Sequence, residues 1–252
     1  MHVMPLRGMH LLLWLVAAMG LSLAAAPVQA GPEGFRFDVS LAGFRVGEVR
    51  FTGKTDGSRY EMQGVMGSKG FFGGLINRRY SGAVIGQQLR GSLRPQVFRG
   101  RFEQRRQYAQ VDIRYANGIP TEVLRTPARP AKPFDIKLSA ARDALDPISG
   151  TYFLLRNQGE GSLCKQNFRV FEGNRLARIV LGRAKESAEI GAKDSVICNG
   201  AYTRLSGFSP EQMADRKTFP FELRYERVND TVWRVQEFTM TTYWGTAKAV
   251  RR

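Results

Sequence analysis

Apolar and polar residues alternate with a period of two along most of this chain, which is typical of β-strands that bury one face. The first run, residues 35–41, puts phenylalanine, valine and leucine on one face and charged or polar residues on the other. An Ala-Gly pair then marks a turn, and a second alternating run covers residues 44–51. These two runs predict a β-hairpin, with Gly47 as a candidate β-bulge.

Strand signals recur along the chain and are separated by turn signals rich in glycine, asparagine and aspartate. We expect the last strand to be kinked at Gly245, residues 184–194 to form an exposed loop and residues 209–213 to form a one-turn helix. The predicted strands after the first hairpin cover residues 59–67, 78–85, 96–104, 106–115, 119–125, 164–171, 175–183, 196–205, 219–227 and 232–249.

One segment departs from the alternation and predicts a helix over residues 147–156. Asp146 can cap its start, and Pro147 occupies the first helical position, where a missing amide hydrogen costs nothing. Apolar residues then recur at helical spacing, and adjacent apolar positions widen the face, so we expect the helix to be buried. The spaced residues are Ile148, Tyr152 and Leu155, and the widening residues are Phe153 and Leu154.

About eleven or twelve strands and one long helix predict an all-β fold. A sheet of this size needs its concave face filled, and the apolar helix is the element that can fill it. We therefore expect a strongly curved antiparallel sheet, or a half-open barrel, wrapped around a central helix. Because no stretch resembles a linker or a repeat, residues 31–252 are predicted to form a single β-barrel-like domain.

Residues 1–30 have the features of a signal peptide. A short segment that ends in Arg7 precedes an apolar run over residues 11–26, and the small residues that end at Ala30 suit a signal peptidase. Cleavage after Ala30 predicts a periplasmic protein with no transmembrane span. A membrane anchor is the alternative, because the apolar run approaches the length that crosses a bilayer.

The chain is strongly basic, with a formal net charge of +16 at pH 7. In an exported compartment nucleic acid is not an expected partner. Anionic lipid, lipoprotein, lipopolysaccharide and other envelope proteins are available there instead. Simple solubility is the other interpretation of the same charge.

Five arginines crowd two neighbouring predicted strands. Arg99 and Arg101 lie two residues apart and therefore share one face of the sheet. This basic stripe is either a solvated outer face or a patch that contacts an anionic ligand or a membrane. Its members are Arg94, Arg99, Arg101, Arg105 and Arg106.

Residues 70–76 are apolar and rich in glycine, without the period of a helix or a strand. Two interpretations fit them equally: a flexible apolar loop that forms the mouth of a ligand pocket, or a buried crossing that needs glycine for close packing. The candidate mouth residues are Phe71, Phe72, Leu75 and Ile76.

Cys164 and Cys198 are the only cysteines of the chain. An oxidising compartment favours a disulfide between them. Closing a loop of this length stabilises a fold by roughly 3.5 to 4 kcal/mol. Two free thiols are the alternative, and a redox pair is disfavoured because the spacing differs from C-x-x-C.

Both histidines, His2 and His10, lie in the predicted signal peptide. Serine nucleophiles therefore lack their usual base, and no metal site, phosphate loop or cofactor motif is recognisable. Carboxylates remain as a catalytic route, since glycoside cleavage needs two acids. Helix capping and charge balance explain them more simply, so we expect no enzyme. The candidate carboxylates are Asp143, Asp146, Glu222, Glu226 and Glu237.

Three segments carry a family resemblance through their order and spacing: F-R-V-G-E at 44–48, A-L-D-P-I-S at 144–149 and C-x5-V-F-E-G at 164–173. Together they resemble the bacterial exported family called domain of unknown function 3108, over about residues 35–245. The resemblance implies a curved antiparallel sheet around a helix, similar in outline to the lipoprotein carriers LolA and LolB and to periplasmic β-spiral proteins. The family has no established activity, so it supplies no catalytic residues.

These observations favour a non-enzymatic periplasmic protein that supports the cell envelope. It would hold the acyl chain of a lipid or lipoprotein, or dock to another envelope protein. The alternatives are a carboxylate-dependent hydrolase of envelope polysaccharide and a plain structural scaffold. Two acids about 5 to 9 Å apart across the concave face would favour the hydrolase, whereas an apolar lining would favour lipid.

Overall fold

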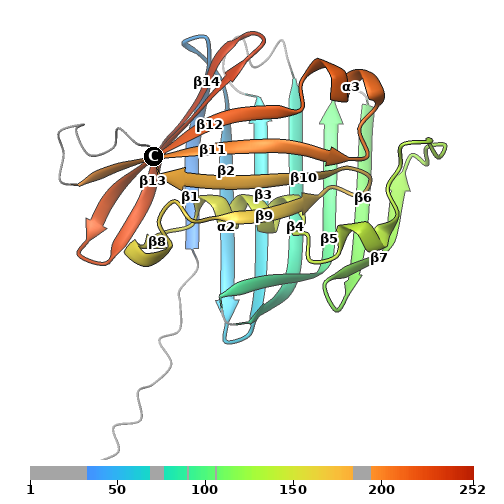
Figure 1. Cartoon of the computed structure of the whole chain (residues 1–252), viewed down its shortest axis with the longest axis horizontal. Helices are drawn as coiled ribbons and strands as arrows, with labels where there is room; N and C mark the ends of the chain where they lie inside the picture. Colours follow the sequence, from blue (N-terminus) through green and yellow to red (C-terminus); the bar gives the residue numbers. More distant parts are fainter. Residues whose placement is uncertain (1–32, 69–76, 90, 106, 184–193) are drawn as a thin grey trace, which may run out of the picture.

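Within the residues that the structure describes, the sheet contains fourteen strands, and all neighbouring strands along it are antiparallel (Figure 1). The predicted all-β fold is therefore confirmed, with more strands than expected. The computed structural model describes residues 33–68, 77–89, 91–105, 107–183 and 194–252.

Each half of the sheet is a meander in which consecutive strands pair. The first half comprises β1 (Glu33–Leu41), β2 (Phe44–Asp56), β3 (Arg59–Ser68), β4 (Arg78–Leu89), β5 (Ser92–Gln104), β6 (Gln107–Ala116) and β7 (Ile119–Thr126). The second half comprises β9 (Asn167–Phe171), β10 (Leu176–Arg183), β11 (Ser195–Ser206), β12 (Thr218–Asn229), β13 (Val232–Thr242) and β14 (Gly245–Arg251), and the two-residue β8 (Gln158–Gly159) pairs with β13.

β1 and β14 join the two halves, since Phe37 pairs with Arg251 and Leu41 with Ala247. The other ends of the strand order are β7 and β9. The sheet therefore stops short of closing by strand pairing, as a half-open barrel does. We call the region where β7 faces the β9–β10 turn the seam.

The helix α2 (Pro147–Leu155) lies between the two halves of the sheet. Figure 1 shows β9–β12 crossing in front of β2–β6, with α2 between them. The helix contacts β3, β4 and β5 on one side and β9 on the other. Contact on both sides explains why apolar residues of this segment are not confined to one face of the helix.

The start of α2 agrees with the sequence prediction. The Asp146 side chain accepts hydrogen bonds from the amides of Ile148 (2.9 Å) and Ser149 (3.0 Å), and Pro147 lies in the first turn. Ile148 and Tyr152 are buried as expected. Leu155 was expected on the buried face but is only half-buried, and Leu154 is in the core instead.

A row of glycines lets α2 pack directly on the backbone of the sheet. Gly64, Gly82 and Gly100 are paired with one another across β3, β4 and β5. A Cβ atom at Gly64 would lie 2.8 Å from Cδ1 of Ile148, and one at Gly82 would lie 2.7 Å from its Cγ1. These distances are shorter than van der Waals contact, so side chains in this row would push the helix away from the sheet.

Three short helices complete the described part of the chain: the 3-10 turns η1 (Leu138–Ala141) and η2 (Glu160–Ser162), and the helix α3 (Pro210–Asp215). α3 occupies the region where a one-turn helix was predicted, and Ser209 and Gln212 form a capping box at its start. Within the described residues no helix has the length and apolar character needed to cross a bilayer.

The sequence prediction of one long strand over residues 232–249 is wrong. The chain turns at Tyr243 and Trp244, and Gly245 adopts a φ of +106°, which favours glycine. β13 and β14 are therefore two strands of a hairpin. Aromatic residues are common in strands, so the aromatic side chains of Tyr243 and Trp244 made this turn look like the interior of a strand.

The disulfide between Cys164 and Cys198 is confirmed, with Cα atoms 5.3 Å apart. Cys198 lies on β11 as predicted, but Cys164 lies in a turn before β9 and not within that strand. Cys164 has a φ of +58°, a conformation that interrupts a strand.

Several sequence predictions fall outside the described residues, and the structure says nothing about them. They are the signal peptide over residues 1–30, the mouth candidates Phe71, Phe72, Leu75 and Ile76, the stripe residue Arg106, and residues 184–193 of the predicted loop.

Candidate functional site

The basic stripe lies on the outer face of the sheet, away from α2. Arg99 and Arg101 are both exposed on β5, and Arg105 is in the β5–β6 turn. Arg101 forms an ion pair with Glu103 at 2.9 Å, and its guanidinium lies 5.4 Å from the ring centre of Tyr108.

Arg94 lies apart from the others, on the rim of a cavity of about 280 Å³ that Asp143 also lines. The stripe is thus divided between two environments. Arg99 and Arg101 together line an open cavity of about 530 Å³ on the outer face, and Arg94 lines the other cavity.

A larger cavity lies at the seam, where the first half of the sheet meets the β9–β10 turn. It has a volume of about 500 Å³. Aromatic and apolar side chains of β4, β5 and β6 form one wall, among them Tyr80, Phe98, Phe102 and Val111. Polar side chains from β7, the following loop and the β9–β10 turn form the other: Arg125, Arg129, Glu172, Asn174 and Arg175. We call this the seam cavity.

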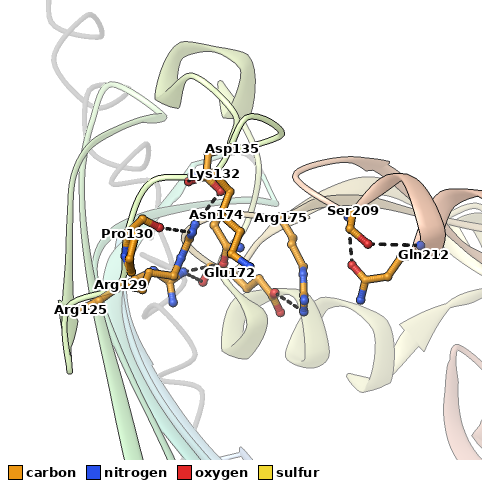
Figure 2. Close-up of polar contacts among 10 residues, drawn as sticks. All are labelled: Arg125, Arg129, Pro130, Lys132, Asp135, Glu172, Asn174, Arg175, Ser209 and Gln212. Atoms are coloured by element: carbon orange, nitrogen blue, oxygen red, sulfur yellow. Dashed lines mark hydrogen bonds and ion pairs between the residues drawn. The ribbon is translucent and has the colours of Figure 1, made fainter.

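Arg125, near the end of β7, is the central polar residue of the seam cavity (Figure 2). Its guanidinium donates hydrogen bonds to the side-chain oxygen of Asn174 (2.7 Å) and to the backbone carbonyl of Glu172 (3.3 Å). Both acceptors are neutral, and no carboxylate of the described residues forms an ion pair with it. Burial, reinforced by the positive charge of Arg129, lowers the pKa of Arg125 below its ordinary value.

Arg129 comes from the proline-rich loop after β7 and is paired. It donates to Asp135 at 2.6 Å and to the carbonyl of Pro130 at 3.1 Å. The hydrogen bond from Arg129 lowers the pKa of Asp135, which also accepts from the Lys132 amide at 2.8 Å. Asp135 therefore stays ionised, and it holds Arg129 at the rim of the cavity.

The β9–β10 turn supplies the opposite side of the seam cavity. Gly173 has a φ of +101°, and a Cβ atom there would lie 2.7 Å from Nη2 of Arg125. Glycine thus allows both the turn and its close approach to β7. Arg175 forms an ion pair with Glu172 at 3.3 Å, and its Nε is buried without a hydrogen-bond partner.

Glu172 and Arg175 also line a second cavity, of about 220 Å³, that extends along α2. Its other walls are mostly apolar and include Leu154, Val170 and Ile179. The two cavities therefore share their polar boundary, with an aromatic wall on one side and the central helix on the other.

The charges at the seam do not balance. The guanidinium groups of Arg125, Arg129 and Arg175 lie near only two carboxylates, those of Glu172 and Asp135. Arg125 carries the unbalanced charge, and it is partly desolvated. An anion at this position would gain charge-assisted hydrogen bonds and would relieve repulsion between the arginines.

Three of the five candidate carboxylates, Asp146, Glu226 and Glu237, are engaged in other contacts, and Asp143 lines the cavity beside Arg94. Asp146 is fully buried at the start of α2, and burial raises its pKa to about 6. Glu226 and Glu237 both contact Arg224, at 2.7 Å and 3.5 Å. Glu222 is exposed on β12.

Neither cavity at the seam is lined by two carboxylates, because Glu172 is the one acid in both linings. Among the described residues, no three His, Cys, Asp or Glu side chains come together as metal ligands.

A family model described as "Protein of unknown function (DUF3108)" matches residues 36–195. This chain belongs to that family. The DUF3108 match includes β7, α2 and the β9–β10 turn, so the seam residues Arg125, Arg129, Glu172 and Arg175 all lie inside it.

Among solved structures, this DUF3108 protein is similar to a β-barrel-like protein of domain of unknown function DUF1849 from Brucella abortus. The identity is 12%, the TM-score is 0.43, and the alignment covers 88% of this chain and 95% of the other. A comparison with curated proteins found no match.

The seam residues were missed by the reasoning from sequence. Arg125 stood at the end of a predicted strand and Arg175 at the start of another, and no motif connects them. The one local signal is the turn sequence Glu172-Gly173-Asn174, whose first two residues end the segment 164–173 that carries the family resemblance.

Proposed function

We propose that this protein is a non-enzymatic periplasmic protein of the cell envelope that binds an anionic amphiphile at the seam. The ligand has one carboxylate or phosphate head group and an acyl chain, as a fatty acid or a single-chain lipid has. Arg125 binds the head group, and the aromatic wall of the seam cavity contacts the chain.

The single observation that carries this proposal is the arrangement of Arg125. A half-buried guanidinium that donates only to neutral oxygens can give up those bonds to an anion and form shorter, stronger ones. Arginine suits this role because its planar group binds two oxygens of a carboxylate or phosphate at once.

The size and lining of the cavity support the same ligand class. Small-molecule sites commonly have volumes of roughly 300 to 1,000 Å³ and an apolar lining with few polar groups. The seam cavity, at about 500 Å³, falls in this range. Tyr80 and Phe102 offer ring surfaces for a hydrocarbon chain, and the fully buried Phe98 lies beneath them.

The positions of the carboxylates favour a binding protein over a hydrolase. Glycoside cleavage needs two carboxyl groups on either side of one bond. Asp146 is enclosed at the start of the helix, and Glu172 faces both seam cavities as a single acid. No observation favours the hydrolase as a second candidate.

The test is a titration of residues 31–252 with a fluorescent fatty-acid analogue. We expect saturable binding by the wild type and affinity weakened about tenfold or more in Arg125→Gln, because a charge-assisted hydrogen bond is lost. Arg99→Gln is the matched control, since Arg99 is an exposed arginine on the outer face of the sheet. The proposal fails if the wild type does not bind, or if the two variants have the same affinity.

A further inference from the structure

Two hairpin turns lie against each other at one end of the sheet (Figure 1). The Ala42 amide of the β1–β2 turn donates to the Thr246 carbonyl beside the β13–β14 turn, at 2.9 Å. Three aromatic side chains are exposed at these turns: Phe44 (56%), Tyr243 (57%) and Trp244 (75%). Trp244 is the most exposed large apolar residue of the described chain. We call these three residues the aromatic tip.

A ladder of alternating arginine and aromatic side chains connects the aromatic tip to the seam. Successive distances from guanidinium carbon to ring centre along it are 5.4, 5.3, 4.7, 5.5 and 4.8 Å. Each contact is within the range of a cation–π interaction, so the ladder is one continuous series of contacts, in which Phe208 is buried. In order from the seam it comprises Arg175, Phe208, Arg204, Phe219, Arg216 and Tyr243.

Positive charge accompanies the exposed rings. Arg216 stacks on Phe219 and Tyr243 without a carboxylate ion pair in the described chain, and the neighbouring Lys217 is exposed. Asp215, the residue before Arg216, accepts a hydrogen bond from the Tyr243 hydroxyl at 2.5 Å. In this segment beside Tyr243, two basic side chains, Arg216 and Lys217, therefore accompany one acid, Asp215.

We propose that the aromatic tip and the adjoining end of the ladder form a docking surface for a bilayer that contains anionic phospholipid. Tryptophan and tyrosine are favoured at the membrane interface because they combine an apolar ring with a polar edge. Lysine and arginine near an anionic bilayer surface add electrostatic attraction. The rings are exposed at two adjacent turns, which suits insertion between head groups.

The inference stands apart from the proposed function, because docking does not require the seam cavity to bind a ligand. Where both hold, the ladder offers an anionic head group a series of arginines between the membrane surface and Arg175. The two proposals also use different residues, so they can fail separately.

The test is co-sedimentation of residues 31–252 with phosphatidylcholine vesicles that contain or lack phosphatidylglycerol, together with tryptophan fluorescence. Trp233 is buried and Trp244 is exposed, so a shift of the emission to shorter wavelength on vesicle addition reports on Trp244. We expect this shift, and vesicle binding weakened about fivefold or more in Trp244→Ala and in Arg216→Gln.

Tyr108→Ala is the matched control, because Tyr108 is an exposed aromatic residue on β6, outside both the tip and the ladder. It should bind vesicles as the wild type does, and so should Arg125→Gln. The inference is overturned if the wild type does not bind, if phosphatidylglycerol makes no difference, or if Trp244→Ala binds as tightly as Tyr108→Ala. The wavelength shift of the wild type needs no variant, so it tests the inference even if a substitution impairs folding.

Discussion

The guanidinium of Arg125 donates a hydrogen bond of 2.7 Å to the side-chain oxygen of Asn174. This contact joins the last strand of the first half of the sheet to the turn between β9 and β10. β7 and β9 do not pair, so the half-open barrel is held across its seam by side chains such as these and by the backbone of Leu145, which forms hydrogen bonds with β9. The same arginine is the residue through which we expect the protein to bind an anion, so ligand binding and the closure of the seam are linked.

Loss of this contact should destabilise the fold modestly. Asn174→Ala removes the acceptor, and we expect the free energy of unfolding to fall by about 1 kcal/mol, as for a partly exposed hydrogen bond to a charged group. Urea denaturation measures the change. Asn199→Ala is the control, because Asn199 is exposed on β11. Equal stability of the two variants would show that the contact does not hold the seam.

The packing of α2 on the glycine row predicts a specific non-additive effect. Gly64→Ala should destabilise by about 1 to 3 kcal/mol, because its Cβ would overlap Cδ1 of Ile148. Ile148→Val removes that atom, so the double variant should lose less than the sum of the two single changes. Gly67→Ala, on the same strand with nothing near its Cβ, should be close to neutral. Additive single changes would contradict the packing described.

The buried carboxyl group of Asp146 should give the free energy of unfolding an unusual dependence on pH. Its pKa in the folded protein is about 6, and burial is the main cause. The ordinary value is about 3.9, so the folded state binds the proton more tightly than the unfolded state does between these pH values. Stability should therefore decrease as pH rises from 4 to 7, by about 2 to 3 kcal/mol relative to Asp146→Asn.

Urea denaturation of both proteins across this pH range measures the difference. Asp135 and Glu237, whose pKa values are lowered, act in the opposite direction. They are present in both proteins and cancel in the comparison. A difference between the two proteins that stays constant with pH would show that Asp146 titrates normally.

Removal of the disulfide should lower the free energy of unfolding more than the loss of any of these side-chain contacts. Cys164→Ala combined with Cys198→Ala opens a loop with a sequence separation of 34. The free energy of unfolding should fall by roughly 3.5 to 4 kcal/mol. Thermal denaturation under non-reducing conditions measures the loss, and the wild type treated with a reductant should approach the double variant. A wild type unaffected by reduction would contradict this assignment.

Features that depend on neighbouring residues could be predicted from the sequence. The strands follow from alternation, and the start of α2 follows from Asp146-Pro147, because both patterns are local. The turn at Tyr243 and Trp244 was missed since aromatic residues also suit strands, and the positive φ of Gly245 was needed to reveal it.

The seam could not be predicted in this way. Arg125 and Arg175 line the same cavity only because the two halves of the sheet wrap around α2. That arrangement depends on contacts between residues that are distant in the sequence. Gly64, Gly82 and Gly100 occur at equal spacing in the chain, a signal for close packing that the strand pattern alone did not bring out.

Native mass spectrometry of the protein purified from cells under native conditions tests the central claim most directly. We expect the wild type to carry an additional mass that matches a single-chain lipid or fatty acid, and Arg125→Gln to carry it in a much smaller fraction. Arg99→Gln should retain it as the wild type does. A wild type that is consistently empty, and that stays empty after incubation with a fatty acid, would contradict the assignment of the seam cavity as a site for an anionic amphiphile.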